Sequence, residues 1–383
     1  MSVHELALQR SKYKHLSDDE WRWFLQQVEG RERTADKLPT FAANSDWWYP
    51  VRLSCEQCSS EQTARYKASL LSPFIFHFSS FLDLTGGYGV DTYFLSQQFE
   101  HTDYVEQNAE LCRIAAHNFG IRNQDSGIKI HNTSAEEFLA SAGQYDWILV
   151  DPARRDSHGG KVFRLADCTP NVVELLPTLL AHGQRLLLKL SPMLDITQAV
   201  KELSAVSWDI HIVAVKNEVK EVLLLSQEPR TKSQETTITA IDLAEPEKAF
   251  VFTKEEERDC PSGIGNLSFV IGHYLYEPNA AILKAGAYKL VATRFGLQKL
   301  DVNTHLYASD TLVPNFPGRV WKIKSPMSNI KSQIEHANVL TRNYPLTPEQ
   351  VKKKYRIKDG GEDYVIGCRV AGQPTLWIGE RIQ

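Results

Sequence analysis

The sequence predicts an α/β protein whose central sheet is mostly parallel, with a helical region before it and smaller α+β domains after it. Two observations support this prediction. From residue 80 onward, apolar strand patterns come singly and alternate with helical patterns, which is typical of a parallel sheet covered by helices on both faces. At residues 229–240, the polar and turn-rich stretch PRTKSQETTITA ends the alternation and indicates a boundary.

The length and composition are those of a folded protein with several domains. At 383 residues the chain is long for one core, so two or three domains are expected. Its 42% apolar and 10% aromatic content excludes a disordered chain. No apolar stretch approaches the ~20 residues of a membrane span, and the N-terminus lacks the apolar core of a signal peptide. We therefore expect a cytoplasmic protein.

The cysteines indicate neither a metal site nor disulfides. Six cysteines in a chain of this size fit a reducing compartment. Cys55 and Cys58 form a C-x-x-C pair, but no second pair completes a tetrahedral zinc site. The other cysteines are scattered: Cys112, Cys168, Cys260 and Cys368. We interpret the pair as incidental and expect no metal.

Residues 1–70 are predicted to be helical. In LSDDEWRWFLQQVEG, Ser17 precedes Glu20 at capping-box spacing, and apolar residues follow on one helix face. In SSEQTARYKASLL, Ser59 precedes Gln62 at the same spacing. A second helix is therefore expected to begin there and to lead into the first strand.

The central sheet is predicted over residues 71–228. Its strands are expected in FLDL, DYVE, IKIHN, DWILVD, RLLLKL, WDIHIVAV and EVLLLSQ. Helices are expected between the first six strands, at residues 91–99, 108–119, 135–141, 170–181 and 195–203. The last two strands follow each other directly, so we expect a terminal antiparallel hairpin on an otherwise parallel sheet.

Two small α+β domains are predicted beyond the boundary. The first, residues 238–314, contains KAFVFTKE, LSFVIGHYLYEP, one helix through NAAILKAGAYKLVATRFG, and HLYASD. The second, residues 315–383, contains RVWKIKSPMS, helices at 328–340 and 348–355, DYVIGCRV and TLWIGE.

The stretch FLDLTGGYGVD, residues 81–91, is predicted to be a strand, a glycine-rich turn and a helix. Its glycines are Gly86, Gly87 and Gly89, whereas a turn that binds a pyrophosphate has the spacing G-x-G-x-x-G. Asp83 lies at the end of the strand, where a carboxylate repels phosphate and suits a cationic ligand. The spacing and this charge argue against a nicotinamide enzyme.

Polar residues follow the next strands at the edge of the sheet where ligands bind. Glu106 ends DYVE, where a carboxylate can accept hydrogen bonds from both ribose hydroxyls. Ser134 and Ala135 follow the third strand, where an adenine edge would lie, and Asp151 and Pro152 follow the fourth. S-adenosylmethionine fits this pattern, because its ammonium and sulfonium groups are cationic.

The segments FLDLTGGYGVDTYFLS, DYVEQN and DWILVDPARR resemble a class I S-adenosylmethionine-dependent methyltransferase, over roughly residues 55–225. Together with LSCEQCSSEQTARYKA, KLSPMLD and LYEPNAAILKAG, they are similar to a bacterial group that carries C-terminal ferredoxin-like and THUMP-like domains and is regarded as modifying RNA. The resemblance implies a Rossmann-like sheet, a ferredoxin-like domain at 238–314 and a THUMP-like domain at 315–383. It implies S-adenosylmethionine binding by Asp83, Thr85, Gly86, Gly87, Gly89, Glu106, Gln107, Ser134, Ala135 and Asp151.

The chain departs from this family at two positions. Thr85 stands where many members have the first glycine, and Ser134 stands where an aspartate usually accepts the adenine amino group. The segment SSEQTARYKA also resembles the helix that helps to close the cofactor site in cap trimethylguanosine synthases.

The motif DPARR resembles the D/N-P-P-aromatic motif of enzymes that methylate amines. This implies that the Asp151 side chain and the Pro152 carbonyl accept hydrogen bonds from the amine. Arg154 replaces the aromatic residue, so the base must stack elsewhere or on the guanidinium plane. Arg154 and Arg155 also suit phosphate contacts, although a structural salt bridge is an equally good interpretation.

Two further features have structural interpretations. Asp91, just after the glycine turn, is interpreted as an acid at a helix N-terminus rather than a ligand contact. The stretch KLSPMLD, from Lys189 to Asp195, either walls the substrate crevice or starts a helix.

The C-terminal part of the chain is basic. From Ala280 onward there are 16 Lys and Arg against 8 Asp and Glu, a balance of +8, which leaves −12 for residues 1–279. VKKKYRIK, residues 351–358, and FPGRVWKIK, around Trp321, interleave basic and aromatic residues as RNA-binding segments do. The alternative is an unevenly charged, solvated surface.

We therefore predict a cytoplasmic methyltransferase that acts on a guanine or adenine nitrogen of rRNA or tRNA, without a metal or a membrane. One alternative is a methyltransferase for a protein or a small molecule. The other is a non-catalytic RNA-binding protein that retains the fold, for which Ser134 and Arg154 are the grounds.

Overall fold

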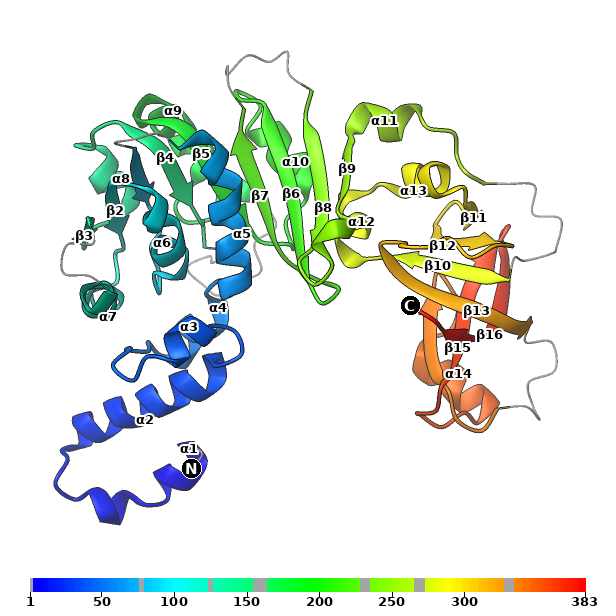
Figure 1. Ribbon diagram of the computed structural model, residues 1–383, viewed down its shortest axis with the longest axis horizontal. Coiled ribbons are helices and arrows are strands. Elements are labelled where there is room, and N and C mark those ends of the chain that lie inside the picture. Colours follow the sequence, from blue (N-terminus) through cyan, green and yellow to red (C-terminus); the bar gives the residue numbers. More distant parts are fainter. Residues whose placement is uncertain are drawn as a thin grey trace. The chain divides into compact units, whose positions relative to one another are not determined.

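The computed structural model (Figure 1) describes residues 3–75, 79–122, 127–153, 164–227, 235–264, 273–326 and 334–383. The chain forms two compact units. The first comprises Met1–Trp208 and Leu223–Ser233, and the second comprises Asp209–Val222 and Gln234–Gln383.

Helical segments build the N-terminal part of the first unit, as predicted. They are α1 (Val3–Ala7), α2 (Asp18–Thr34), α3 (Pro39–Ala42), α4 (Arg52–Gln57) and α5 (Glu61–Leu71), with 3₁₀ turns at Arg10–Tyr13 and Ser72–Phe74. The predicted capping box of α2 is confirmed: Oγ of Ser17 accepts from Glu20 N (3.2 Å), and the Glu20 carboxylate accepts from Ser17 N (2.7 Å). At α5 the prediction was wrong by one residue, because Ser60 is the N-cap and accepts from Thr63 N (3.2 Å).

The strands of the first unit follow the order β3-β2-β1-β4-β5-β7, and those from β3 to β5 run parallel. Their bounds are β1 (Ser80–Asp83), β2 (His101–Val105), β3 (Ile128–His131), β4 (Tyr145–Val150), β5 (Gly183–Leu190) and β7 (Glu218–Ser226). The pairs from β3 to β5 are all parallel; Leu82 on β1, for example, lies opposite Asp103 on β2 and Ile148 on β4. The predicted parallel sheet is therefore confirmed.

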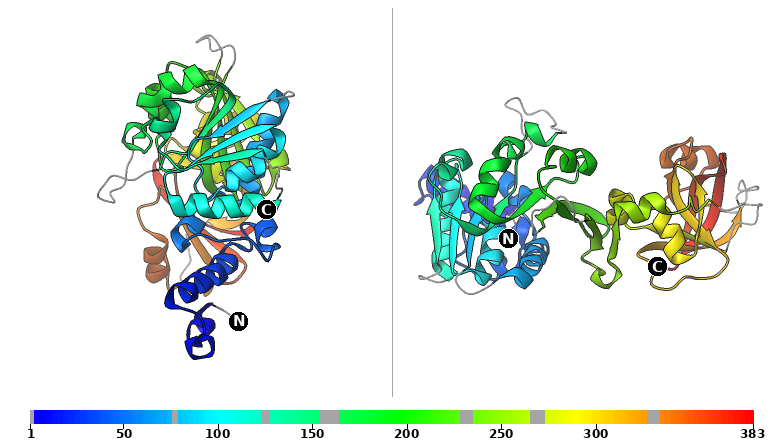
Figure 2. Two further views of the ribbon diagram at one scale, coloured as in Figure 1. Left: turned by 90° about the vertical axis from the view of Figure 1, so that its left-hand side faces the viewer. Right: turned by 90° about the horizontal axis from the view of Figure 1, so that it is seen from above.

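Helices alternate with these strands and lie on both faces of the sheet (Figure 2). They are α6 (Val90–Leu95), α7 (Ala109–Arg122), α8 (Ala135–Leu139), α9 (Val172–His182) and α10 (Ile196–Glu202), with 3₁₀ turns at Ser96–Gln98 and Leu165–Asp167. Strands covered on both faces are apolar throughout, as the fully buried Leu186, Leu187 and Leu188 on β5 illustrate. The strand order changes direction between β1 and β4, which opens a crevice at their carboxyl ends.

The predicted hairpin forms, but it does not end the sheet, which continues with two further strands. β6 (Trp208–Val215) and β7 are neighbours joined by Lys216 and Asn217, whose φ angles of +51° and +62° are those of a two-residue type I′ turn. In the second unit β8 (Thr237–Asp242) pairs in parallel with β6, and β9 (Phe250–Thr253) pairs antiparallel with β8. Residues 237–240, predicted to lie in a boundary stretch, are therefore part of a strand.

A second sheet in the second unit has the order β11-β12-β10-β13-β16-β15-β14. Its strands are β10 (Tyr274–Pro278), β11 (Gln298–Asp301), β12 (Thr304–Ser309), β13 (Gly318–Pro326), β14 (Asn338–Arg342), β15 (Asp363–Val370) and β16 (Gln373–Arg381). Its helices are α11 (Lys254–Asp259), α12 (Ala280–Ala285), α13 (Tyr288–Phe295) and α14 (Pro348–Tyr355), and a 3₁₀ turn lies at Pro246–Lys248. Leu275, Trp321 and Ile366 belong to the core of this sheet.

Two helix predictions in the second unit were wrong. The single helix expected through residues 279–296 is two helices, because Gly286 has a φ of +79° and ends α12 before α13 begins at Tyr288. Of the helix expected at 328–340, residues 338–340 belong to β14, which pairs in parallel with β15, and residues 328–333 lie outside the described residues. The helix expected at 348–355 is confirmed as α14.

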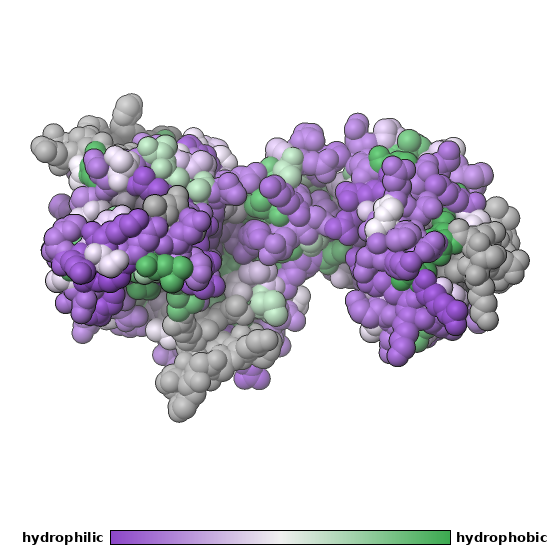
Figure 3. Space-filling view, turned by 90° about the horizontal axis from the view of Figure 1, so that it is seen from below, coloured by the Kyte–Doolittle hydropathy of each residue, from purple (hydrophilic) through white to green (hydrophobic). Residues whose placement is uncertain are grey.

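Among the described residues, no helix is long and apolar enough to cross a membrane. Figure 3 shows hydrophilic residues over most of the face that it presents, with small separated hydrophobic areas.

Candidate functional site

A cavity of about 300 Å³ lies in the first unit, at the carboxyl ends of β1, β2, β4 and β5. Most residues predicted to bind a cofactor line it: Asp83, Thr85, Gly86, Gly87, Gly89, Glu106, Gln107, Ala135 and Asp151. Further lining residues come from the segment before α5 (Ser54, Gln57, Cys58 and Ser59) and from β5 (Lys189). A crevice at this edge of an open α/β sheet is where ligands bind in such folds.

The glycine turn between β1 and α6 is held by backbone and side-chain bonds. Gly86 N donates to Val105 O (2.8 Å), and Gly89 N donates to Gly86 O (2.8 Å). Gly87 and Gly89 have φ angles of +56° and +81°, which a residue with a side chain rarely adopts. The turn therefore favours glycine at both positions for conformational reasons.

Asp83 lies beneath the turn, at the end of β1, with only 2% of its surface exposed. Its carboxylate accepts hydrogen bonds from Thr92 Oγ1 (2.6 Å) and Thr85 N (3.2 Å). Burial raises the pKa of Asp83 to about 7, because these two hydrogen bonds only partly offset the lost hydration. Asp83 therefore titrates near neutral pH.

Glu106 links the ends of β1 and β2. One carboxylate oxygen accepts from Gly87 N (2.9 Å) and the other accepts from Asn108 N (2.8 Å). Each oxygen keeps a second lone pair for a ligand, and the side chain lines the cavity. The carboxylate is therefore fixed in place and can accept two further hydrogen bonds.

Thr85 links the ends of β1 and β4. Its Oγ1 accepts a hydrogen bond from Asp151 N (2.7 Å). Thr85, which stands where many family members have a glycine, thus fixes the backbone of Asp151, the predicted catalytic aspartate. The side chain of Asp151 is 38% exposed at the rim of the cavity.

A cluster of buried charges, which the sequence did not reveal, lies beside Asp151. Nζ of Lys189 is 2.5 Å from Asp151 Oδ2 and 3.2 Å from Asp91 Oδ2, and Nζ of Lys67 is 3.1 Å from Asp91 Oδ1. Burial alone would raise the pKa of Asp91, but the charges of Lys67 and Lys189 outweigh it and lower the pKa to about 2. Asp91 lies in the first turn of α6, as predicted, but its main partners are these two lysines.

A signal for this cluster was present in the sequence. Lys189 interrupts the apolar run RLLLKL, and Lys67 falls among Ala64, Ala68 and Leu71 on one face of a predicted helix. A lysine in such a place is buried only when it is paired. In the stretch KLSPMLD, Lys189 lines the cavity, while Asp195 starts a helix as the N-cap of α10 and accepts from Gln198 N (2.9 Å).

Two predicted site residues, Ser134 and Pro152, do not line the cavity among the residues that the structure describes. Ser134 is the N-cap of α8 and accepts from Glu137 N (3.2 Å), and its neighbours Thr133 and Ala135 line the cavity instead. Pro152 is buried beside the cavity. Arg154 lies outside the described residues.

Ala153 and Thr169, which are far apart along the chain, pair with each other at the cavity rim. Ala153 N donates to Thr169 O (2.8 Å) and Thr169 N donates to Ala153 O (3.0 Å). Both residues line the cavity.

The C-x-x-C pair adjoins the cavity as free thiols. Burial raises the pKa of Cys55 to about 12 and also raises that of Cys58, so neither is a reactive thiolate at neutral pH. Within the described part of the chain, no group of three or more His, Cys, Asp or Glu side chains could hold a metal ion.

Comparison with known proteins extends the similarity to nearly the whole chain. A crystal structure assigned as a methyltransferase from Porphyromonas gingivalis W83 is 34% identical, has a TM-score of 0.83, and the match covers 96% of this chain and 92% of that one. Two Mycobacterium tuberculosis proteins, from strains CDC 1551 / Oshkosh and ATCC 25618 / H37Rv, are each described as an uncharacterized S-adenosylmethionine-dependent methyltransferase. Each is 20% identical over 360 residues, covering 91% of this chain and 92% of theirs.

The C-terminal part also matches two family profiles. A profile described as a ferredoxin-like domain matches residues 274–317, and one described as THUMP domain-like matches residues 318–381.

Proposed function

Since this chain belongs to the S-adenosylmethionine-dependent methyltransferases that carry C-terminal ferredoxin-like and THUMP-like domains, we propose that it methylates a base nitrogen in structured RNA, either rRNA or tRNA. The observation that supports this most is the convergence of Asp83, Glu106 and Asp151 from three neighbouring strands on one cavity. Such an enzyme would act in the cytoplasm.

The cavity suits S-adenosylmethionine by its charge and its hydrogen-bond acceptors. When bound, this cofactor supplies a methyl group on a sulfonium, which a nucleophilic nitrogen can accept. We assign the methionine end to Asp83, Thr85 and the glycine turn, where a carboxylate can face a cation. Glu106 and Gln107 would bind the ribose, and Ala135 would lie near the adenine.

The acceptor amine is assigned to Asp151. Its carboxylate at the cavity rim can accept a hydrogen bond from the amine and orient the nitrogen lone pair. Aligning two reactants in this way can lower a barrier by on the order of 7–11 kcal/mol. We keep Pro152 and Arg154 as proposed partners of the acceptor and Ser134 as a proposed cofactor contact, in the roles that the family resemblance implies.

RNA is proposed as the substrate because of the THUMP-like match and the basic C-terminal part. Lys353, Lys354 and Arg356, at the end of α14, are exposed and form no ion pair among the described residues. Such side chains can neutralise phosphates.

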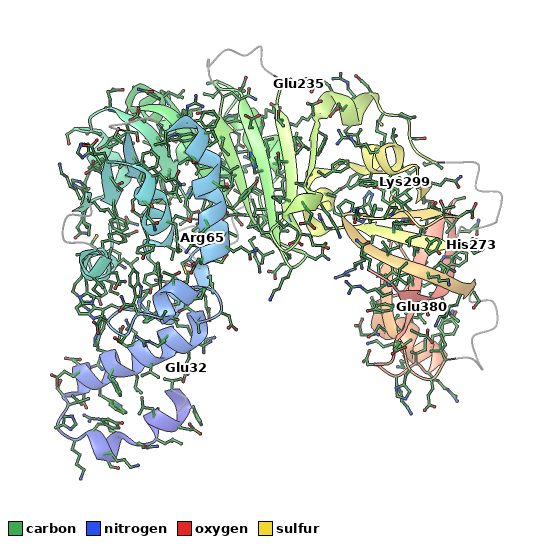
Figure 4. The ribbon with its side chains drawn as sticks, viewed as in Figure 1. Glu32, Arg65, Glu235, His273, Lys299 and Glu380 are labelled. Carbon is green, nitrogen blue, oxygen red and sulfur yellow. The ribbon has the colours of Figure 1, made fainter. Side chains whose placement is uncertain are left out.

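Another basic residue of the same region is less available for contacts with RNA phosphates. Lys324 is paired with Asp363 (2.9 Å) and Glu380 (2.9 Å). Glu380, labelled in Figure 4, lies on β16. Trp321, the aromatic residue of the segment FPGRVWKIK, is fully buried in the core, so its ring is not available to stack on an RNA base.

The proposal is tested by comparing modified nucleosides, by mass spectrometry, in RNA from cells with and without the gene. We expect one methylated nucleoside to disappear with the gene and to return with the wild-type protein. Asp151→Ala should fail to restore it, while Asp36→Ala, at an exposed position on the same unit, should restore it fully. An unchanged set of nucleosides, with labelled methyl groups found in protein or small molecules, would favour the alternative substrate class.

A further inference from the structure

Alternating charges extend from the interior of the first unit to the rim of the cavity. They begin at Lys67 on α5, which is fully buried, continue through Asp91 and Lys189, and end at Asp151. The exposed fraction of the side chains rises from 0% at Lys67 to 38% at Asp151. The first turn of α6, the end of β5 and helix α5 thus meet in one cluster.

The ammonium group of Lys189 is fixed by this cluster. Its three N–H donors have three acceptors: Ser59 Oγ at 3.0 Å, Asp91 Oδ2 at 3.2 Å and Asp151 Oδ2 at 2.5 Å. Ser59 is held in turn, because its hydroxyl donates to Asp91 Oδ2 (2.7 Å) and accepts from Lys67 Nζ (3.3 Å). Lys189 therefore has little freedom to leave Asp151.

Asp151 is held at two points and is open at a third. Its backbone N–H donates to Thr85 Oγ1, and its Oδ2 faces Lys189. Among the described residues, no group donates a hydrogen bond to its Oδ1, and the side chain lines the cavity. One oxygen is thus bound and the other is presented to the cavity.

Stability alone is a weak explanation for this arrangement. Buried ion pairs contribute little net stability, because the cost of removing both charges from water is comparable to their attraction. Of the two carboxylates that Lys189 contacts, Asp91 already has Lys67 as a partner, so Asp151 is the one that depends on Lys189.

We propose that Lys189 is the positioning residue for Asp151. Its ammonium holds Oδ2, so that Oδ1 faces the acceptor amine and accepts its hydrogen bond. The nitrogen–methyl bond would form as the sulfur–methyl bond of the donor breaks, with the electron pair of that bond left on sulfur. Oδ1 can accept the proton that the nitrogen releases and pass it to solvent. Asp91, Ser59 and Lys67 fix the ammonium from behind. This proposal takes one point from the proposed function, namely that the methylated amine belongs to an RNA base.

The first test is the kinetics of methyl transfer from labelled S-adenosylmethionine to RNA from cells that lack the gene. Lys189→Met should lower kcat on the order of 10²-fold, since a misplaced catalytic group costs that much. The KM for S-adenosylmethionine should stay near the wild-type value, and Lys189→Arg should recover part of kcat because it keeps the charge and the donors.

The matched control is Lys201→Met, which removes the same charge from an exposed position on α10 and should leave kcat unchanged. A wild-type kcat in Lys189→Met, or no recovery in Lys189→Arg, would overturn the proposal.

A second test needs no substrate and distinguishes failure of this proposal from failure of the proposed function. The Tm of Asp151→Asn, Lys189→Met and the double variant is compared with that of the wild type. The double variant should lose less than the two single losses combined, because each single variant leaves a partner unpaired. Strictly additive losses would show that the pair is not coupled, whatever the substrate proves to be.

Discussion

The ring of Tyr104 fills the space that a side chain at position 86 would need. A Cβ added to Gly86 would lie 2.0 Å from Cε2 of this ring, and the hydroxyl of the same ring donates to Gly87 O (2.6 Å). Tyr104 is fully buried and packs edge-on against Phe119, with ring centroids 5.8 Å apart. One residue of β2 thus both shapes and holds the turn that follows β1.

We expect Gly86→Ala to lower the free energy of unfolding by roughly 1–3 kcal/mol, because the ring of Tyr104 cannot move without disturbing its packing. Urea denaturation measures the loss. Gly143→Ala is the control, since a Cβ at position 143 would meet no atom within 4 Å. Equal stability of the two variants would contradict the proposed clash.

The ionisation of Asp83 should make stability fall as pH rises. Its pKa is raised from 3.8 to about 7 by burial, so the folded protein retains a proton that the unfolded chain has lost. Between about pH 4 and pH 7 the free energy of unfolding should therefore decrease, by at most about 1.4 kcal/mol per pH unit from this group. Asp91 does not contribute in this window. Its pKa is lowered to about 2, so the stability that its ionised carboxylate contributes to the fold is lost only in stronger acid. Asp83→Asn should remove this part of the slope; an unchanged slope would show that Asp83 is ionised throughout.

The same group should couple cofactor binding to pH. A cationic ligand favours the ionised form of Asp83, and below about pH 7 binding must first release the proton. We expect the affinity for S-adenosylmethionine to rise between pH 6 and pH 8, with proton release that calorimetry in two buffers can detect. Asp83→Asn should bind more weakly and without this pH dependence. Proton uptake on binding would refute the assignment.

Glu106→Gln should weaken S-adenosylmethionine binding by roughly 10- to 100-fold, the loss expected for hydrogen bonds to a charged group. An amide oxygen can replace only one of the two carboxylate oxygens, so either Gly87 N or Asn108 N loses its acceptor. Calorimetry measures the affinity. Glu110→Gln is the control, because Glu110 pairs with Arg113 on the exposed side of α7.

The RNA proposal gives a salt-dependent prediction. Replacing both Lys353 and Lys354 with alanine should weaken binding to total cellular RNA. It should also reduce the slope of log K against log salt by about 0.7 to 0.9 for each phosphate that the variant no longer neutralises. Lys324→Ala should have a much smaller effect, since Asp363 and Glu380 already neutralise this residue. Filter binding at several salt concentrations separates the two variants.

The sequence predicted the parts of the site that depend on local pattern. Asp83, Glu106 and Asp151 follow apolar strand runs, and the carboxyl ends of parallel strands meet at one edge, so their convergence follows from order along the chain. The Lys67–Asp91–Lys189 contacts could not be predicted in this way, because they join three elements that no periodicity relates.

Local pattern also explains the errors in the second unit. Gly286 lies within a stretch of apolar residues at helical spacing. This pattern predicts one continuous helix more strongly than a single glycine predicts a helix end. Residues 338–342 form a strand because β15 lies beside them, and that partner is more than twenty residues away along the chain.

The hydrogen bond between Ser59 and Lys189 also has a consequence for biosynthesis, because it joins residues 130 positions apart. A nascent chain that has emerged only as far as Asp151, just after β4, already contains the glycine turn and Asp91, but it lacks the ammonium that lies between the two carboxylates. The crevice therefore gains this ammonium only after β5 has left the ribosome, so a truncated translation product carries the glycine turn and both carboxylates without the charge that lies between them.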